Sequence, residues 1–573
     1  MENKFTALTI GPIYKTLSQT RKTRELWGAS FMFSYLMRKI IEGLGNTQNC
    51  VLPYHNDMLN LARSKGAGLF PDRLIFKGDV REKIITVSEN VIHEIARISE
   101  LPEEYLKHYF RISTICFEVP LDKPVVYNSD GNKSTDSNVV FIADKLLDST
   151  ELHEKYTPSI TNLDWKKAID KLNGKLFYRE AFSGKDNSFK FPSIPEISTD
   201  DFRKRDKTTY YRIVNEILNR APNPGESEEE NEDKNQKDFL NRLKTEKAFI
   251  PLKLRPYHKY IAVVQADGDN IGNTVRKIGK DPETVKQFSS ALFEFDLRAV
   301  ELIKEFGGKA VYIGGDDLLF FAPVAVAIVN SNNENTPKSI TYLNTVFSLL
   351  RKLDKAFKEK VIESPVLKHL YDKGGELEGN IPSMSYGISI TYSKYPLNEA
   401  REKAYFNLMK AKEKKDDKNK ICFSLQKHSG QSFGFIVDKK KRDNKVPKSF
   451  EKFIAMVSSI PVIEGEKLLT SVIYKLAPLH KLLVSIAGDH DRLKTFFDQE
   501  FDLDKDVNRM SAEEKAKESF IDSVVEYYFS LATEFNEDNK PLPSSESDDT
   551  VTNIGKLYST LRFVKHLTDE DNE

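Results

Sequence analysis

Residues 309–323 decide the fold of this chain, and they read Lys309-Ala-Val-Tyr-Ile-Gly-Gly-Asp-Asp-Leu-Leu-Phe-Phe-Ala-Pro323. Two short apolar runs flank the pair Gly314 and Gly315, and paired glycines tolerate the positive φ that a tight turn requires. The stretch therefore predicts a β-hairpin with Asp316 and Asp317 at its tip. Adjacent carboxylates repel each other unless a cation lies between them, and hard carboxylate oxygens suit Mg²⁺. An isolated Gly-Gly-Asp-Asp sequence would more simply be a solvated acidic turn.

A second pair of carboxylates ends another apolar run, Tyr260-Ile-Ala-Val-Val-Gln-Ala-Asp-Gly-Asp269. The run predicts a β-strand with Asp267 and Asp269 at its C-terminal end. The spacing of these aspartates also matches the start of an EF-hand calcium loop. Ile271 and Ile278, however, stand where that loop needs oxygen ligands, so the segment is better explained as a strand end.

The segments around these two motifs predict a ferredoxin-like palm domain. Apolar residues recur at helical spacing over about 283–306, 339–362 and 396–415, and strand-like runs cover 384–392 and 421–424. The resulting order, β-α-β-β-α-β-α-β, is a ferredoxin-like unit with an added helix and strand. In this topology the end of the first strand lies beside the tip of the hairpin, so Asp267 and Asp316 would share a metal site. Two Mg²⁺ ions held there could clamp the attacking and leaving oxygens of a phosphoryl displacement.

With these residues identified, the chain resembles the nucleotidyl-cyclase and polymerase palm superfamily, and within it the large subunit of type III-B (Cmr) CRISPR effector complexes. The matching motifs are the Gly-Gly-Asp-Asp hairpin, the Asp-Gly-Asp strand end, Ser385-x-Gly387, the helix 404–412 with Lys418-Asn419, and residues 8–30 with their Arg-rich, Trp-containing helix start. The resemblance implies an α+β protein with two ferredoxin-like palm domains and additional helical domains.

The resemblance also implies roles for individual residues. Asp267 and Asp316 would ligate metal, with the Gly268 carbonyl nearby, and Asp317 would be a further ligand or help to deprotonate the attacking hydroxyl. Nucleotide binding would involve Gly314, Gly315, Asp269, Ser385, Lys412 and Lys418, the two lysines at the triphosphate. Ser385 could instead satisfy a strand-edge hydrogen bond, and both lysines could be ordinary solvated side chains.

For function, the resemblance implies a nucleotidyltransferase that uses ATP and two Mg²⁺ or Mn²⁺ ions. Its product would be cyclic oligoadenylate, or a conjugate of AMP with S-adenosylmethionine as co-substrate. The partners would be guide RNA, target RNA and the other subunits of the ribonucleoprotein. The alternative is a non-catalytic scaffold that organises guide RNA and partner subunits. A freestanding diguanylate-type cyclase is a third alternative, which the paired palms and the 8–30 motif disfavour.

The chain departs from many members of that family in two respects. It starts at the first palm, which predicts a version without the N-terminal histidine-aspartate nuclease domain. It also holds three scattered cysteines, Cys50, Cys116 and Cys422, which are too few for a four-thiol zinc ribbon.

Length and composition divide the 573 residues into four predicted domains. These are a first palm at 1–160 that lacks a carboxylate after its opening strand, a mostly helical linker at 161–254, the catalytic palm at 255–428 and a helical bundle at 429–573. The acidic stretch 222–238 within the linker predicts a disordered loop.

Charge and hydropathy limit the partners of the chain. Its 86 basic and 86 acidic residues cancel, so RNA contacts must come from local patches, of which Lys439-Lys-Lys-Arg442 is the clearest candidate. The longest apolar stretch, 318–329, is too short to span a bilayer, so no membrane contact is expected. Three unpatterned cysteines agree with a reducing cytoplasm.

Overall fold

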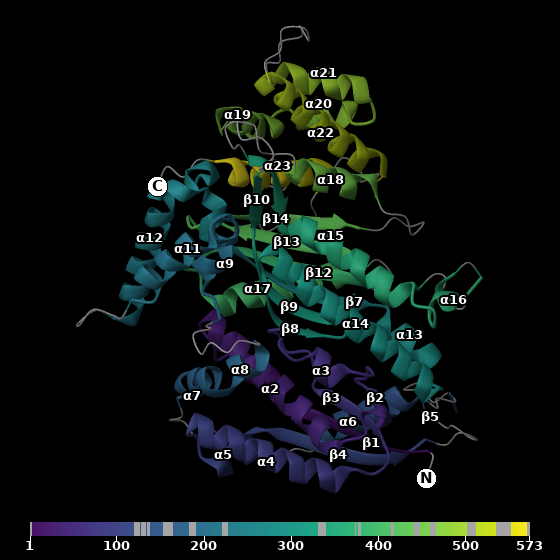
Figure 1. Ribbon diagram of the computed structural model, residues 1–573. Coiled ribbons are helices and arrows are strands. Elements are labelled where there is room, and N and C mark those ends of the chain that lie inside the picture. The colour runs from purple at the N-terminus through teal and green to yellow at the C-terminus, as the bar shows by residue number, and fades with distance from the viewer. Residues whose placement is uncertain are drawn as a thin grey trace.

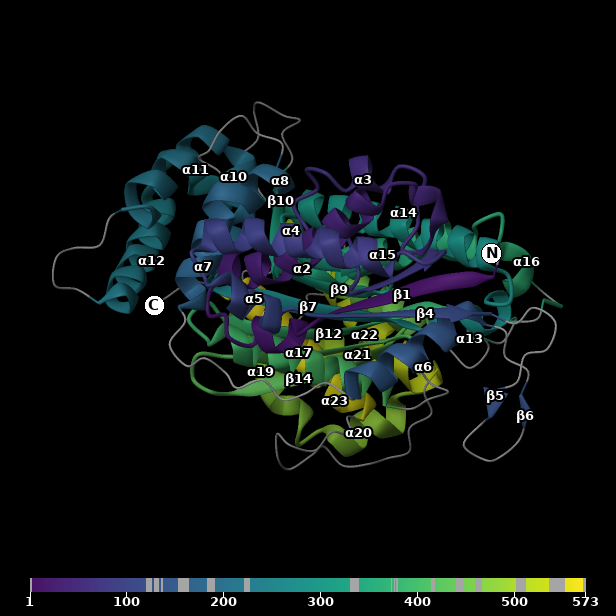
Figure 2. The same ribbon diagram turned by 90° about the horizontal axis from the view of Figure 1, so that it is seen from below.

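The computed structural model shows two α+β domains stacked on each other, with helices at one side and at one end (Figures 1 and 2). It describes residues 3–569 except 120–125, 128–132, 135–137, 153–163, 183–190, 221–226, 330–339, 373, 376, 378–379, 414–417, 440–446, 459–465, 501–511 and 535–551.

The first palm is built on a four-stranded antiparallel sheet. Its strands are β1 (Lys4–Gly11), β2 (Cys50–Leu52), β3 (Arg73–Lys77) and β4 (Arg111–Glu118), in the order β2-β3-β1-β4. The helices α2 (Thr23–Leu44) and α4 (Arg81–Ser99) complete the β-α-β-β-α-β pattern, and α6 (Val139–Leu152) follows the last strand. The helices α1 (Ile13–Leu17), α3 (Met58–Leu61) and α5 (Glu103–Tyr109) are short additions. The first palm is therefore ferredoxin-like, as predicted.

The second palm has a six-stranded sheet in the order β14-β13-β12-β7-β9-β8. Four strands make up the ferredoxin-like part: β7 (Tyr260–Asp269), β8 (Lys309–Gly314), β9 (Asp317–Pro323) and β12 (Ser383–Tyr392). Its helices are α13 (Ile271–Ile278), α14 (Pro282–Phe306), α15 (Val346–Phe357) and α17 (Leu397–Lys412), with a short α16 (Lys368–Tyr371). β13 (Lys420–Gln426) pairs parallel to β12 and is the predicted added strand.

The second palm corrects two expectations. Residues 340–345, predicted as the start of a helix, form β11 (Ile340–Thr345), which pairs with β10 (Ala325–Val329), and the helix α15 begins at Val346. Residues 432–438, assigned to a helical bundle, form β14 (Ser432–Asp438), which extends the sheet antiparallel to β13. In both segments the backbone N–H and C=O groups form their hydrogen bonds with a neighbouring strand. The spacing of apolar residues along the chain does not predict such pairing.

The linker helices lie beside both palms (Figure 2). They are α7 (Trp165–Leu172), η2 (Asn173–Phe177), α8 (Tyr178–Ala181), α9 (Ile194–Ser198), α10 (Asp200–Arg205), α11 (Lys207–Ile213), η3 (Val214–Leu218) and α12 (Glu228–Thr245). The expectation of a disordered loop at 222–238 is wrong for residues 228–238, which form the first part of α12, while 221–226 lie outside the described residues. Ser227 and Glu230 form a capping box there, acidic residues suit a helix N-terminus, and Phe239 is fully buried.

The C-terminal helices stand at the far end of the second palm (Figure 1). They are α18 (Lys448–Ser458), α19 (Glu466–Leu476), α20 (His480–Ile486), α21 (His490–Glu500), α22 (Ala512–Glu534) and α23 (Asn553–Thr568). Lys439, the start of the basic run considered for RNA contact, is buried at the end of β14, where its Nζ lies 2.7 Å from Asp354. It therefore belongs to the core, and Lys440–Arg442 lie outside the described residues.

Direct contacts join the two palms. A loop of the first palm pairs with the edge strand of the second, since Gly68 bridges Tyr312 and the Ile313 N–H donates to the Gly68 carbonyl at 2.9 Å. Ser289 of α14 accepts the Tyr54 N–H at 2.8 Å, and Asn398 of α17 donates to the Ser18 carbonyl at 2.8 Å. Within the described residues, no helix is both long and apolar enough to cross a membrane.

Gly387 in β12 allows α17 to pack directly on the sheet. A Cβ at this position would lie 2.1 Å from the Ala404 carbonyl oxygen and 2.2 Å from the Leu408 nitrogen, both of them backbone atoms. We predict that Gly387→Ala destabilises the protein by about 1–3 kcal/mol, because a helix backbone cannot yield as a side chain can. Thermal unfolding followed by circular dichroism measures the loss. Gly272→Ala in α13, where a Cβ meets nothing within 4 Å, is the matched control; equal melting temperatures for both variants would contradict the prediction.

Candidate active site

The turn between β8 and β9 carries the Gly-Gly-Asp-Asp motif, and its shape depends on Gly315. This residue has φ +73°, a conformation that favours glycine. Its N–H donates to Oδ2 of Asp296 at 2.9 Å. Asp296 lies on α14 beneath the turn and is fully buried, and this burial raises its pKa well above the ordinary value. The buried carboxyl therefore holds the turn from below.

The turn meets the end of β7 at Gly268. A Cβ on Gly268 would lie 2.6 Å from Cβ of Asp316 and 2.9 Å from its Oδ2, so the close approach of Asp316 requires glycine at this position. Asp267 stands next to Gly268 in β7 and pairs with Ser385 of β12 in the sheet register. The predicted meeting of the strand end with the hairpin tip is therefore present, and it brings Asp267 and Asp316 together.

Lys412, the last residue of α17, occupies the space between the carboxylates. Its Nζ lies 2.5 Å from Oδ1 of Asp267, 3.7 Å from Oδ1 of Asp269 and 3.0 Å from the Gly268 carbonyl oxygen, to which it donates. The side chain of Lys412 is 14% exposed and that of Asp267 is 31% exposed, so the pair faces a partly open space. Lys418, the other predicted phosphate ligand, is half-buried one residue before Asn419.

Asp269 and Ser385 lie beneath this surface. Both are completely buried, and the Ser385 hydroxyl donates to Oδ2 of Asp269 at 2.7 Å. The same oxygen accepts from the Ser383 hydroxyl and from the Asn419 N–H, each at 2.9 Å. Asp269 thus ties the ends of β7 and β12 to the start of β13, while the structure leaves no exposed surface on Ser385 for direct contact with a ligand.

The carboxylates of the turn are short of positive charge. Desolvation and the charge of Asp267 raise the pKa of Asp316. Desolvation and the charges of Asp316 and Asp267 raise the pKa of Asp317 further. Asp317 is exposed to solvent, so repulsion from the neighbouring carboxylates acts on it more strongly than burial does. A further cation at this position would relieve that repulsion.

The donor chemistry fits a hard divalent ion. Asp267 and Asp316 offer carboxylate oxygens, and Gly268 offers a carbonyl oxygen that already attracts a cationic group. No three His, Cys, Asp or Glu side chains in the described part of the chain are grouped so as to hold a metal ion by themselves. A bound Mg²⁺ would therefore complete its shell with water or substrate phosphates, as this ion commonly does.

Several supporting residues were not predicted from the sequence. Asp296 belongs to a regular amphipathic helix, where no local pattern marks it. Asp72 comes from the first palm, and its charge contributes to the raised pKa of Asp317. The ion pair of Lys439 with Asp354 supports β12 from behind, because Lys439 also donates to the Met384 carbonyl and Asp354 accepts from Tyr386. These contacts join residues far apart in sequence, so no local sequence motif could predict them.

Two family models match the chain in the regions of its two palms. The model described as "Cas10/Cmr2, second palm domain" matches residues 260–422, which contain the whole candidate site. The model described as "CRISPR-associated protein Cmr2, N-terminal" matches residues 5–96 in the first palm.

Individual relatives agree with these models. The CRISPR system Cmr subunit Cmr2 of Pyrococcus furiosus is 24% identical over an alignment of 300 residues. The alignment covers 48% of this chain and 29% of that protein, so the match spans less than a third of the relative. The type III-B Cmr-β structure in its apo state has a TM-score of 0.55 at 14% identity, covering 98% of this chain and 82% of the other. The Cmr-β structure bound to cognate target RNA has a TM-score of 0.50 at 12% identity, covering 89% and 80%. The chain thus contains a region that matches the Cas10/Cmr2 second palm domain, which holds the site described above, and a region that matches the Cmr2 N-terminal domain.

Proposed function

We propose that this chain is the nucleotidyltransferase subunit of a type III-B CRISPR effector complex, and that target RNA activates it to make a signalling nucleotide from ATP. One observation carries the proposal: Asp316 packs against Gly268 and beside Asp267, with Lys412 among them, in a second palm of the Cas10/Cmr2 family. Neighbouring folds described as Cmr-β complexes, one of them bound to target RNA, support guide RNA, target RNA and sister subunits as partners, and hence a cytoplasmic location.

In this proposal Asp267, Asp316 and the Gly268 carbonyl would hold Mg²⁺ or Mn²⁺. Two such ions supply charge stabilisation for the attacking and leaving oxygens of a displacement at phosphorus. Asp317 is exposed at the turn, where its carboxylate can accept the proton of an attacking 3′-hydroxyl or extend the metal shell. The backbone of Gly314 and Gly315 sets the position of both aspartates.

The remaining site residues fall into two groups. Lys412 and Lys418 would bind the triphosphate, and Lys412 must leave the Gly268 carbonyl to do so. Asp269 and Ser385 would act from beneath by fixing the end of β7, since neither has exposed surface. Both groups fit an ATP site in which metal and lysines hold the phosphates, because the sequence contains no Gly-x-x-x-x-Gly-Lys-Ser/Thr loop.

The product is cyclic oligoadenylate, or AMP joined to S-adenosylmethionine, with release of pyrophosphate in each case. Both reactions attack the α-phosphate of ATP and require the same carboxylates. Organising guide RNA as a scaffold is compatible with either chemistry, but a scaffold alone would not need Asp267, Asp316 and Asp317 crowded at one point, where their repulsion costs stability.

We predict that the variant Asp316→Ala/Asp317→Ala makes no nucleotide product while still binding RNA and partner subunits. Reconstituted complex is incubated with target RNA, Mn²⁺ or Mg²⁺ and labelled ATP, with and without S-adenosylmethionine, and the products are identified by mass spectrometry. Loss of the metal-binding carboxylates should lower the rate by at least about a hundredfold. If wild type yields no product with any cofactor, although RNA binding is intact, the scaffold function is correct instead.

A second prediction concerns Lys412. Its ammonium group is bound to Asp267 and the Gly268 carbonyl, two of the proposed metal ligands, so it competes with a metal ion. Lys412→Met should therefore bind Mn²⁺ about tenfold more tightly in the absence of nucleotide, as measured by electron paramagnetic resonance, and should bind ATP more weakly. Lys410→Met on the same helix is the control, because Nζ of Lys410 lies over the ring of Phe406 instead. Unchanged Mn²⁺ affinity in Lys412→Met would show that these oxygens are not metal ligands.

A further inference from the structure

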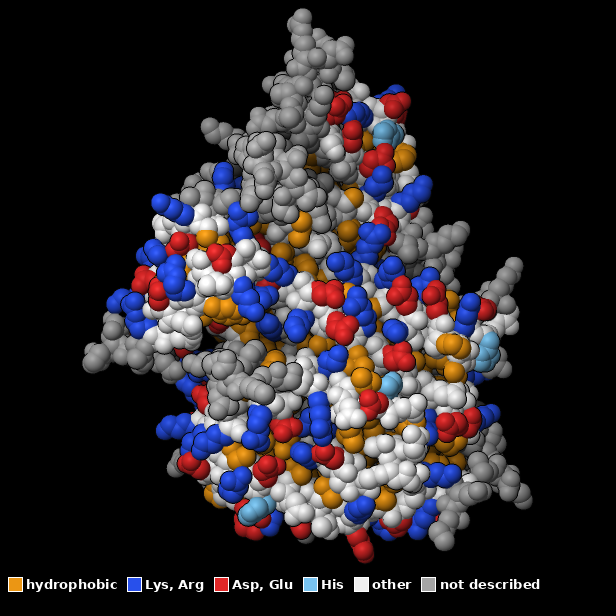
Figure 3. Space-filling model, in the orientation of Figure 1, with side chains coloured by type: hydrophobic (Ala, Val, Ile, Leu, Met, Phe, Trp, Pro, Cys, Tyr) orange, Lys and Arg blue, Asp and Glu red, His pale blue; other side chains and the backbone are white. Residues whose placement is uncertain are grey.

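We propose that a second site, a positively charged cleft between the linker helices and the palms, binds single-stranded RNA through its phosphates. We call it the basic cleft. It lies between the start of α2, the segment η2–α8, the helices α11 and α12, and the connection from β12 to α17. In Figure 3 a hollow with Lys and Arg side chains on its rim opens at this side of the molecule. The choice of RNA as ligand rests on the proposed function; the existence of an anion site does not.

The basic cleft is large enough for an oligomer. Its volume is about 2350 Å³. Pockets for drug-sized ligands are typically about 300–1,000 Å³, so a mononucleotide would leave most of the cleft empty.

The charge of the cleft differs from that of the whole chain. Twelve Lys and Arg residues line it against five Asp and Glu residues, whereas the whole chain has equal numbers. Seven of the twelve make no ion pair within the described residues; Lys309 is partly buried, and the other six are exposed at the surface: Arg21, Lys175, Arg179, Lys207, Arg220 and Lys304. A local excess of this kind attracts polyanions even when the net charge is zero.

Asp200 and Glu196 act on the charge of Lys309, but none of the acidic residues of the lining forms an ion pair with any of the seven cations within the described residues. Glu25 accepts the Arg21 backbone N–H at 2.9 Å, and Glu196 caps α9 by accepting from Ser193 at 2.8 Å. The other three form ion pairs with different basic side chains: Asp200 with Arg203 and Lys204, Glu232 with Lys22, and Asp233 with Lys394. The excess positive charge is therefore left for a ligand.

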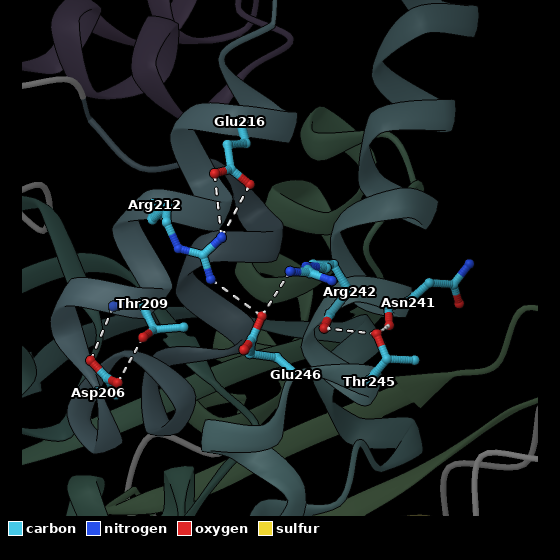
Figure 4. A network of polar contacts seen from close by, with 8 residues as sticks. All are labelled: Asp206, Thr209, Arg212, Glu216, Asn241, Arg242, Thr245 and Glu246. Carbon is cyan, nitrogen blue, oxygen red and sulfur yellow. Dashed lines mark hydrogen bonds and ion pairs between the residues drawn. The ribbon is translucent and has the colours of Figure 1, made fainter.

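The outer wall of the cleft is already ordered without a ligand (Figure 4). Glu246, the residue after α12, accepts from Arg212 of α11 at 3.3 Å and from Arg242 of α12 at 3.0 Å, which ties the end of α12 to α11. Arg212 also forms an ion pair with Glu216. Asp206 caps α11 by accepting the Thr209 N–H at 3.0 Å. In this network Arg212 and Arg242 are both occupied by ion pairs behind the wall. The network also fixes the position of Lys207, the first residue of α11, at the cleft.

Aromatic groups in the lining favour a single strand of RNA over an acidic protein segment. Tyr211 of α11 lines the cleft with 40% of its surface exposed, which leaves its ring free to stack on a base. Proteins that bind single strands without sequence preference combine a positive groove with such stacking platforms. Burial lowers the pKa of Lys309 at the floor, so an arriving phosphate would stabilise its charged form.

The basic cleft is distinct from the aspartate site. Lys309 is the first residue of β8 and Gly314 is the last, which places the two sites about 16 Å apart along the strand. The strand and α14 nevertheless connect them, because Lys304 near the end of α14 lines the cleft and Asp296 of the same helix holds Gly315.

The test measures RNA binding by the full chain without ATP or metal. The probe is a fluorescein-labelled single-stranded RNA of about 16 nucleotides, followed by anisotropy at several salt concentrations. The variant Lys175→Glu/Arg179→Glu/Lys207→Glu is compared with Lys145→Glu/Lys352→Glu/Lys481→Glu, which reverses three exposed lysines outside the cleft. Three lost phosphate contacts should weaken binding by at least about tenfold at low salt and reduce the slope of log K against log salt by about 2.

Equal losses in the two triple variants would overturn the proposal, and so would a polyglutamate competitor that displaces RNA as well as unlabelled RNA does. Tyr211→Ala, which changes no charge, should weaken RNA binding severalfold. It replaces the triple variant as the test if charge reversal lowers the melting temperature. Asp316→Ala/Asp317→Ala should bind RNA as wild type does. Because the assay involves no catalysis, a chain that binds RNA in the cleft but makes no product would refute only the proposed chemistry.

Discussion

The close approach of Asp316 to the backbone of Gly268 is the constraint on which the rest of the site depends. It needs a glycine at the end of β7, a left-handed glycine in the β8–β9 turn, and a buried acid beneath that turn to fix its N–H. Each of these residues belongs to a different element, so the sheet order β12-β7-β9-β8 must form before the carboxylates can meet. The palm fold therefore concentrates negative charge at one end of a rigid sheet. Repulsion among these carboxylates lowers the stability of the folded protein, and a bound cation would restore it.

Some of the surrounding polar groups support the fold of the site, and others face the space where the reaction would take place. Asp269, fully buried and hydrogen bonded to two serines and a backbone N–H, fixes the geometry of three strands. Lys412 supplies a positive charge from the end of α17, a helix that Gly387 allows to lie directly on the sheet. The first palm lacks a carboxylate after β1, yet it supplies the loop around Gly68 that pairs with β8 and the charge of Asp72 beside Asp317.

Much of this architecture can be predicted from the sequence because apolar periodicity and glycine placement are local signals. The hairpin, the strand ending in Asp269 and the helix ending at Phe306 follow from them. Residues 340–345 and 432–438 could not be assigned in this way, since each is a strand only by virtue of its neighbour. The acidic composition of 228–238 suggested disorder, but capping and the burial of Phe239 outweigh it. Lys439 was expected in a basic patch for RNA contact and is instead buried against Asp354, and no sequence signal marked Asp296, because the partners of both residues lie on other elements.

The most direct test of the account is a structure of the protein with Mn²⁺ and a non-hydrolysable ATP analogue, with the metal located by its anomalous scattering. The account predicts a Mn²⁺ peak bonded to Asp267, Asp316 and the Gly268 carbonyl oxygen, with Nζ of Lys412 moved from that carbonyl to the triphosphate. Nucleotide bound elsewhere, or Lys412 still bonded to Gly268 with no metal between the aspartates, would contradict it.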